Sequence, residues 1–126
     1  MKTLIAMLAV LGLVVGGGIW SNNRLVTSAH TLNTQVKKVM ADVGDEHWTS
    51  AQSGVRRLNQ EWHRQGKWWP VFLDHQEMDN IDFALARAEK YVYTRDRALA
   101  LGEFSELRSM IEHLPEKEAV NMKNIL

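Results

Sequence analysis

The chain has 126 residues and a mass of 14.4 kDa, a length that accommodates one modest domain. Basic and acidic residues number 15 each, so the charge balance argues against a protein that holds nucleic acid through a basic surface. No cysteine is present, which excludes disulfides, thiolate metal sites and cysteine nucleophiles.

The first element is an apolar stretch at the start of the sequence. Residues 3–23 carry no charge and are strongly apolar from Leu4 to Trp20. As a helix this stretch is roughly 31 Å long, close to the thickness of a bilayer's hydrocarbon core. We therefore expect residues 1–23 to be an uncleaved transmembrane signal anchor, with Trp20 at the membrane surface. A cleaved signal peptide, with Gly16-Gly17-Gly18 as the cleavage region, is the alternative.

The orientation of this span follows from the charges on its two sides. Lys2 and the amino terminus favour a cytoplasmic N-terminus, whereas Arg24, Lys37 and Lys38 on the other side weaken that preference. Only two residues precede the span, so a signal anchor is the simpler topology. It places the body, residues 24–126, outside the cell.

Within the span, Gly12 and Gly16 form a Gly-x-x-x-Gly pair. Glycines four residues apart share one helix face and let a second helix approach closely. The interpretation we favour is glycine that is merely tolerated in a membrane helix; a packing surface for a partner helix is the functional alternative.

After Trp20, apolar or small residues recur at alternating steps of three and four, the spacing of one helix face. The four stripes are Leu25, Ala29, Leu32, Val36, Val39 and Val43; Trp48, Ala51, Val55, Leu58 and Trp62; Met78, Ile81, Leu85, Ala88 and Val92; and Ala100, Phe104, Leu107, Ile111 and Leu114. No helix breaker separates the first stripe from the span, so the two can form one continuous helix. The pattern predicts an all-α protein, with an N-terminal transmembrane helix followed by an antiparallel four-helix-bundle-like body.

Glycine, proline and aspartate mark the expected helix boundaries. Gly44 ends the first body helix and Asp45 is placed to cap the second. Pro70 fits the first turn of the third helix, and Asp96 is the expected cap of the fourth. Pro115 is expected to end or bend the fourth helix.

One short segment combines an imidazole with several carboxylates. On a helix, His75 and Asp79 share a face with Asp82, and Asp74 and Glu77 lie nearby. Such a cluster could hold a divalent metal or transfer protons. Because acidic residues stabilise helix starts, capping and surface roles are the interpretation we favour.

A second concentration is aromatic. Trp62 belongs to the second apolar stripe and is expected in the core. Trp68 and Trp69 are adjacent in a predicted turn, where two indoles cannot easily both point inward. One of them is expected at a membrane surface or a partner contact. Basic residues nearby do not lead us to expect nucleic-acid binding, because the body as a whole is balanced in charge.

The sequence contains none of the common enzyme motifs that we looked for. No nucleotide-binding glycine loop, Ser-His-Asp arrangement or HExxH helix can be found. We therefore expect no enzymatic activity and assign no catalytic residue, cofactor, metal site or small-molecule substrate.

The second half of the sequence carries a resemblance. The segments around His75 and Glu77, around His113, and the terminal Lys123-Asn124-Ile125-Leu126 are similar to small membrane-anchored proteins of Firmicutes called domain of unknown function 4363. The resemblance covers nearly the whole chain, and His75, Glu77, His113 and Asn124 match its recurrent pattern. That family has no established activity. Its genes often neighbour those of YetF-like multi-pass membrane proteins, which implies a membrane partner.

Three functions compete at this point. The first is a non-enzymatic accessory or interaction subunit in a bacterial cytoplasmic membrane, bound to another membrane protein or to further copies of itself. The second is an extracytoplasmic helical-bundle sensor or metal-binding module. The third is a soluble bundle released by cleavage of the N-terminal segment.

Overall fold

A computed structural model describes residues 1–67 and 73–125, with side chains as far as residue 115. These residues form four helices: α1 (Lys2–Gly44), α2 (Trp48–Gln65), α3 (His75–Tyr93) and α4 (Arg97–Ile125). No strand occurs in the part of the chain that the structure describes. The all-α prediction is confirmed.

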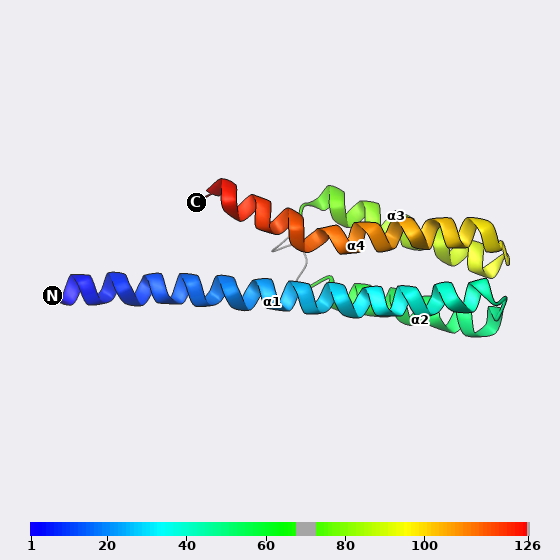
Figure 1. Cartoon of the computed structure of the whole chain (residues 1–126), viewed down its shortest axis with the longest axis horizontal. Helices are drawn as coiled ribbons and strands as arrows, with labels where there is room; N and C mark the ends of the chain where they lie inside the picture. Colours follow the sequence, from blue (N-terminus) through cyan, green and yellow to red (C-terminus); the bar gives the residue numbers. More distant parts are fainter. Residues whose placement is uncertain (68–72, 126) are drawn as a thin grey trace.

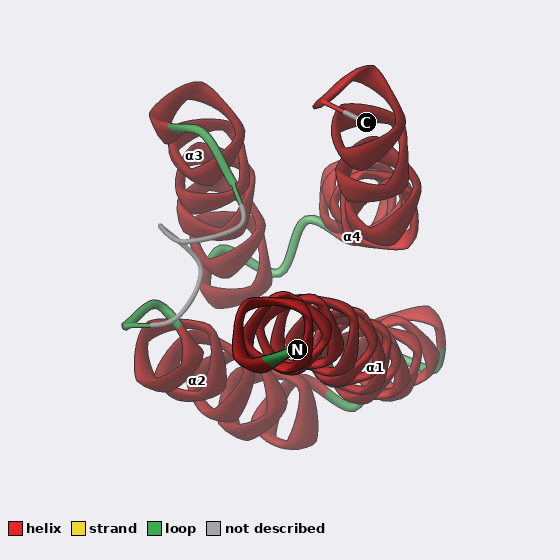
Figure 2. Cartoon of the chain, turned by 90° about the vertical axis from the view of Figure 1, so that its left-hand side faces the viewer, coloured by secondary structure: helices red, strands yellow, loops and turns green. Residues whose placement is uncertain are grey.

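The helices run alternately in opposite directions and pack as an antiparallel bundle (Figure 1). Viewed along the bundle, they occupy four corners (Figure 2). The helix pairs in extensive contact are α1 with α2, α2 with α3, α3 with α4, and α4 with α1. Each helix thus packs against its neighbours in the chain, as short connections dictate, and α1 closes the square against α4.

The helix α1 is uninterrupted over 43 residues, so the span and the first body helix are one element, as expected. About 1.5 Å per residue makes it roughly 64 Å long. Its N-terminal part projects beyond the other helices, whereas the part after Leu25 lies inside the bundle (Figure 1). We call the end of the bundle where α1 enters the entry end, and the opposite end the distal end.

The core consists of the four predicted apolar stripes together with Leu73 and Ala84, which the predicted stripes did not include. The buried apolar side chains are Leu25, Ala29, Leu32, Val36, Val39, Val43, Ala51, Val55, Leu58, Trp62, Leu73, Ile81, Ala84, Leu85, Ala88, Val92, Ala100, Phe104, Leu107, Ile111 and Leu114. Trp48 and Met78, the first residues of their stripes, are half-buried and pack against this core. Burial of these side chains is the main force that holds the helices together, because most of the stability of helices in proteins comes from packing of their apolar faces.

The two turns at the distal end have the same geometry. The amide of His47 bonds to the carbonyl of Asp42, and that of Asp96 bonds to the carbonyl of Tyr91. This six-residue closure is the Schellman pattern, in which one residue adopts a left-handed conformation. Here Glu46 and Arg95 adopt it, with φ of 58° and 57°. Two identical turns give both helix pairs the same sharp reversal.

The predicted helix starts are partly confirmed. Asp96 caps α4, because its Oδ1 accepts a hydrogen bond from the Leu99 amide at 3.0 Å. The assignment of Asp45 as a cap of the second helix is wrong. Asp45 is the residue that ends α1, and α2 begins after His47, which makes no side-chain cap hydrogen bond. Three residues, Asp45 to His47, separate the two helices, and they place the start of α2 beyond the reach of the Asp45 side chain.

The third helix begins later than expected. Its N-cap is Asp74, whose Oδ1 accepts from the Glu77 amide at 2.8 Å, so Pro70 is not in the first turn of α3. Pro70 itself lies outside the described residues. An aspartate that satisfies an orphan amide sets the helix start more strongly than a proline that merely tolerates one.

Pro115 lies inside α4 and does not end it. The helix continues to Ile125, so termination at Pro115 is wrong. Proline lacks the amide that would bond to the preceding turn, which weakens the helix locally without stopping it. In Figure 1 the last part of α4 turns away from α1, as the expected bend requires.

The core assignment can be tested on α4. Leu107 is 1% exposed, whereas Ser105 on the same helix is exposed. We expect Leu107→Asp to lower the free energy of unfolding by several kcal/mol, because it buries an unpaired carboxylate. Ser105→Asp, the matched control, should change it by less than about 0.5 kcal/mol. Thermal melts followed by circular dichroism measure both, and equal melting temperatures would contradict the assigned face.

Gly54 lies where α1 and α2 approach each other closely. A Cβ added at Gly54 would meet Cγ2 of the buried Val39 at 2.7 Å, whereas one added at Gly102 on α4 would meet nothing within 4 Å. The sequence pattern did not identify this contact. Only a residue without a side chain fits there while Val39 keeps its place.

These two glycines form a matched pair for a stability test. Gly102→Ala should stabilise the bundle by about 0.5–1 kcal/mol, since alanine favours a helix. Gly54→Ala has the same helix-forming benefit but overpacks the interface, at a cost of about 1–3 kcal/mol. We expect the melting temperature of Gly54→Ala to fall below that of Gly102→Ala. The reverse order would show that Val39 moves aside freely.

Candidate functional site

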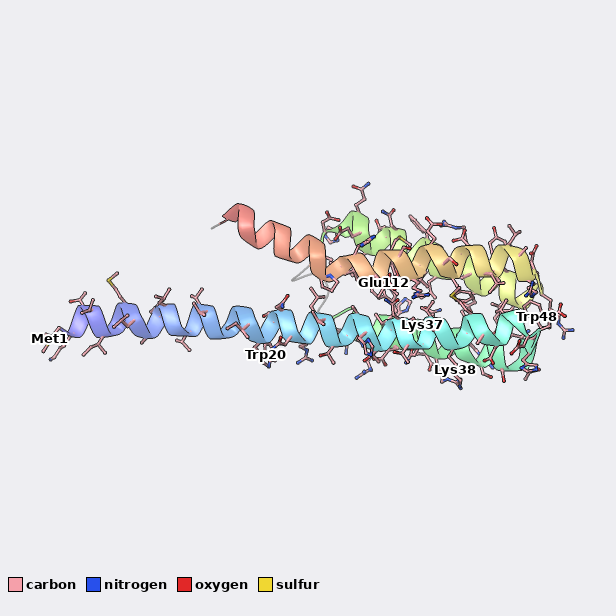
Figure 3. The ribbon with its side chains drawn as sticks, viewed as in Figure 1. Met1, Trp20, Lys37, Lys38, Trp48 and Glu112 are labelled. Carbon is pink, nitrogen blue, oxygen red and sulfur yellow. The ribbon has the colours of Figure 1, made fainter. Side chains whose placement is uncertain are left out.

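The most prominent feature is the apolar part of α1 that stands outside the bundle. Its large apolar side chains are exposed, for example Leu4 at 61% and Leu13 at 76%. Figure 3 shows these side chains pointing away from α1 in several directions, and no other helix lies against most of this part of α1. An apolar surface this large and continuous is unusual for a protein surrounded by water alone.

Length and hydropathy agree with that surface. Within the described residues, α1 is the one helix long and apolar enough to cross a membrane. Its most apolar window has a mean hydropathy of 2.2, and none of that window is buried inside the protein. A core helix would pass the same test of composition but would be covered by its neighbours.

The change from exposed to buried occurs within one short stretch. Trp20 is 58% exposed and Leu25 is 2% exposed. Between them, the Arg24 guanidinium lies over the Trp20 ring, 5.3 Å from its centre. Such a cation–π contact places a charge and an amphipathic ring at the same level of the helix. This is the residue pair expected where a span leaves a bilayer.

The Gly12 and Gly16 face of α1 is open. A Cβ added at either position would meet no atom within 4 Å. This face therefore makes no close packing contact within the described part of the chain, in contrast with Gly54. The geometry leaves it accessible to a second helix, and its use by a partner remains a prediction.

The residues of the acidic segment at the start of α3 have separate tasks. Asp74 caps the helix, His75 and Asp79 are exposed, and Asp82 accepts a hydrogen bond from the Trp62 indole Nε1 at 2.5 Å. Among the described residues, no group of three or more His, Asp or Glu side chains is arranged to hold a metal ion. The predicted capping role is confirmed for Asp74.

The pair of Trp62 and Asp82 was missed by the sequence pattern. Trp62 is buried at 3% exposure, as predicted, but its indole N–H needs an acceptor there. Asp82 provides it from the edge of the α3 stripe, beside the buried Ile81. A polar residue next to an apolar stripe is the signal that could have indicated such a partner.

Two further polar contacts connect or border α2 and α3. Asn59 donates to Glu89 across the two helices at 3.1 Å. On α2, Arg64 donates to Glu61 at 2.6 Å, and this bond lowers the pKa of the Glu61 carboxyl below its usual range. Glu61 is therefore charged at neutral pH and is committed to an ion pair on its own helix.

The outer side of α2 is slightly hollowed, with a space of about 280 Å³. Its lining residues are Arg56, Asn59, Gln60 and His63. His63 Nδ1 lies 2.8 Å from the Asn59 carbonyl oxygen, a contact within the same helix. This open hollow lacks the combination of nucleophile, base and orienting group that nucleophilic catalysis needs.

The residues that carried the family resemblance gather toward the entry end. Arg87 of α3 and Glu103 of α4 form an ion pair at 2.9 Å, which sets the register of these antiparallel helices. Glu77 is ten residues before Arg87, and His113 is ten residues after Glu103, so Glu77 and His113 lie at the same level of this antiparallel pair. His75 and His113 are exposed. Asn124 belongs to the α4 helix, but its side chain lies outside the described residues.

Trp68 and Trp69 lie outside the described residues. The level of the last residue of α2 follows from the contact of Gly54 with Val39. Gln65 is eleven residues after Gly54, and Ser28 is eleven residues before Val39, so the two lie at the same level of the antiparallel pair. The helix α2 therefore ends at the entry end of the bundle.

The Trp62–Asp82 bond gives a direct test of a structural role for the acidic segment. Asp82→Ala should lower the free energy of unfolding by about 1–3 kcal/mol, because it leaves a buried indole N–H without its acceptor. Asp79→Ala, an exposed change on the same helix, should have less than about 0.5 kcal/mol effect. Chemical denaturation followed by Trp fluorescence distinguishes them. Equal stability of the two variants would show that the bond contributes nothing.

Comparison with known proteins identifies one family. The model of the family described as Domain of unknown function (DUF4363) matches residues 19–125. The matched region covers most of the chain, from the end of the apolar segment through all four helices. No curated protein and no solved structure matches the chain.

Proposed function

The chain belongs to the family described as Domain of unknown function (DUF4363), and we propose that it is a non-enzymatic single-pass membrane protein that acts as an accessory subunit of a bacterial membrane-protein complex. One observation carries the proposal. The N-terminal part of α1 is apolar, long enough to span a bilayer, and uncovered by the rest of the protein.

A lipid bilayer is the environment that suits the exposed apolar side chains of the N-terminal part of α1. A helix that is apolar on all sides must be covered, either by other protein or by a membrane. Within the described residues no helix covers it, and its backbone hydrogen bonds are satisfied internally, as a bilayer requires. We therefore favour retention of the segment as an anchor over its removal.

The boundary residues support the position of the span. Trp20 and Arg24 lie at the point where the apolar surface ends and the buried stripe begins. An aromatic ring and a cation at one level suit the headgroup region. The signal-anchor topology then places the four-helix body outside the cytoplasmic membrane.

A role in association rather than catalysis rests on how the polar side chains are used. The described carboxylates of Asp74, Asp82, Glu61 and Glu103 are engaged in caps, hydrogen bonds and ion pairs that stabilise the bundle. What the chain offers to a partner is an uncovered membrane helix with an open glycine face. A multi-pass membrane protein, such as the YetF-like class implied by the resemblance, is the partner we propose.

The test is recovery of the partner from native membranes in a mild detergent. Gly12→Leu/Gly16→Leu keeps the span apolar but prevents close approach of two backbones. We expect the double variant to stay in carbonate-washed membranes while its co-purification of a specific membrane protein falls about tenfold, the effect of losing roughly 1–2 kcal/mol of helix packing. Gly17→Leu, on a neighbouring face of the same helix, is the matched control and should retain the partner.

Several outcomes would contradict the proposal. Recovery of a mature protein that begins after Gly17 would eliminate the anchor. The absence of any specific membrane protein in the native pull-down would eliminate the accessory role, and mutual capture of two differently tagged copies alone would replace it with self-association. If Trp68→Ala/Trp69→Ala releases the partner and the glycine variant does not, the contact surface is in the body.

A further inference from the structure

The last part of α4 reaches beyond the core of the bundle toward the membrane-spanning part of α1. At the distal end, Arg97 Nε donates to the Gly44 carbonyl at 3.0 Å, which fixes the level of α4 against α1. Residue 116 is nineteen residues after Arg97, and Leu25 is nineteen residues before Gly44, so these two lie at the same level of the antiparallel helices. By the same count, residue 125 is level with Gly16. Figure 1 shows the same relation, with the end of α4 beside the projecting part of α1.

The core ends at the same level on both helices. Leu25 is the first buried residue of α1 and Leu114 is the last buried residue among the described side chains of α4. At Pro115 the missing amide weakens the helix, and beyond it α4 turns away from α1 (Figure 1). The segment 116–125, which we call the terminal segment, thus leaves the bundle at the height where the span begins.

The composition of the terminal segment conflicts with the depth that a straight path would give it. Alongside α1, its last residues would lie at the level of Gly16, within the hydrocarbon core. By the same count Lys117 and Asn121 would lie level with Arg24 and Trp20, at the membrane surface, whereas Lys123 and Asn124 would lie below it, at the level of Gly18 and Gly17, and are too polar for that depth. Ala119, Val120, Met122 and Ile125 are apolar, so the sequence suits neither the hydrocarbon core nor water alone.

We propose that the terminal segment is an interfacial helix that lies on the phospholipid surface and gives the protein a second membrane contact beside its span. A helix with mixed apolar and polar residues satisfies both in the plane between headgroups and acyl chains. From the bend at Pro115 the segment inclines away from α1 (Figure 1), so it is not packed along the span. The proposal rests on the proposed membrane span.

The charges of the segment indicate which lipid it fits. Glu116 and Glu118 balance Lys117 and Lys123, so the segment has no net charge. Binding through a polybasic patch would need anionic lipid, whereas apolar insertion does not. The surface we assign is therefore zwitterionic phospholipid, for which phosphatidylcholine is the probe, with no requirement for acidic headgroups.

The absence of native cysteine permits a clean measurement of depth. Single-cysteine variants of the full chain, Met122→Cys, Val10→Cys and Leu99→Cys, are labelled with an environment-sensitive fluorophore and placed in phosphatidylcholine nanodiscs. Val10 reports the span, and Leu99 is an exposed residue near the distal end. Circular dichroism confirms that each variant keeps the helix content of the unsubstituted protein.

We expect a nitroxide on the lipid headgroup to reduce emission from the label at 122 about twofold, as suits a helix some 5–10 Å into the interface, and to leave the label at 99 unchanged. A nitroxide deep in the acyl chain should quench the label at 10. If the label at 122 behaves like that at 99 while 10 is quenched, the interfacial helix is wrong and the span stands. If 10 also behaves like 99, the proposed span itself fails. Quenching at 122 only when acidic lipid is added would overturn the assigned surface.

Discussion

One continuous helix, α1, carries both the exposed apolar part of the chain and a quarter of the bundle, and the rest of the structure depends on it. The apolar side chains of α1 are exposed on all sides before Trp20 and form a single buried stripe from Leu25 onward. No linker separates these parts, so the direction of the exposed apolar part fixes the orientation of the bundle. The two parts are joined by a roughly 64 Å rod of hydrogen-bonded backbone.

The antiparallel order of the helices then gives the two ends of the bundle different characters. Both tight turns, with Glu46 and Arg95 in left-handed conformations, lie at the distal end together with the bond from Arg97 to Gly44. The entry end collects the start of α3, the point where the core stripe of α4 stops, and the last turn of α2. The up-and-down order therefore places the exposed apolar part of α1 at one end of the bundle and the tightest connections at the other.

Hydrogen bonds between polar side chains set the position of α2 relative to α3. The Trp62 indole finds an acceptor in Asp82, and Asn59 reaches Glu89 across the same pair of helices. Such bonds add little net stability, but a mismatched register would leave a buried donor unpaired, which is costly. They fix how α2 and α3 lie against each other, where a purely apolar seam would tolerate sliding. The acidic segment that resembled a metal site thus contributes to folding through Asp74 and Asp82.

The sequence by itself determined the helical class and the four core stripes, because the spacing of apolar residues directly encodes which face of a helix is buried. It also indicated the apolar start of α1 and, through short motifs, the family. That the apolar start of α1 is uncovered was shown only by the structure. Only the tertiary structure decided the contacts between helices. The close approach at Gly54, the acceptor role of Asp82 and the shift of the α2 start beyond Asp45 depend on which residues face one another across the bundle. The course of α4 through Pro115 was decided there too, since a proline weakens one turn of a helix without determining whether the helix ends or bends. Periodicity reports burial along one helix and carries no information about register between two.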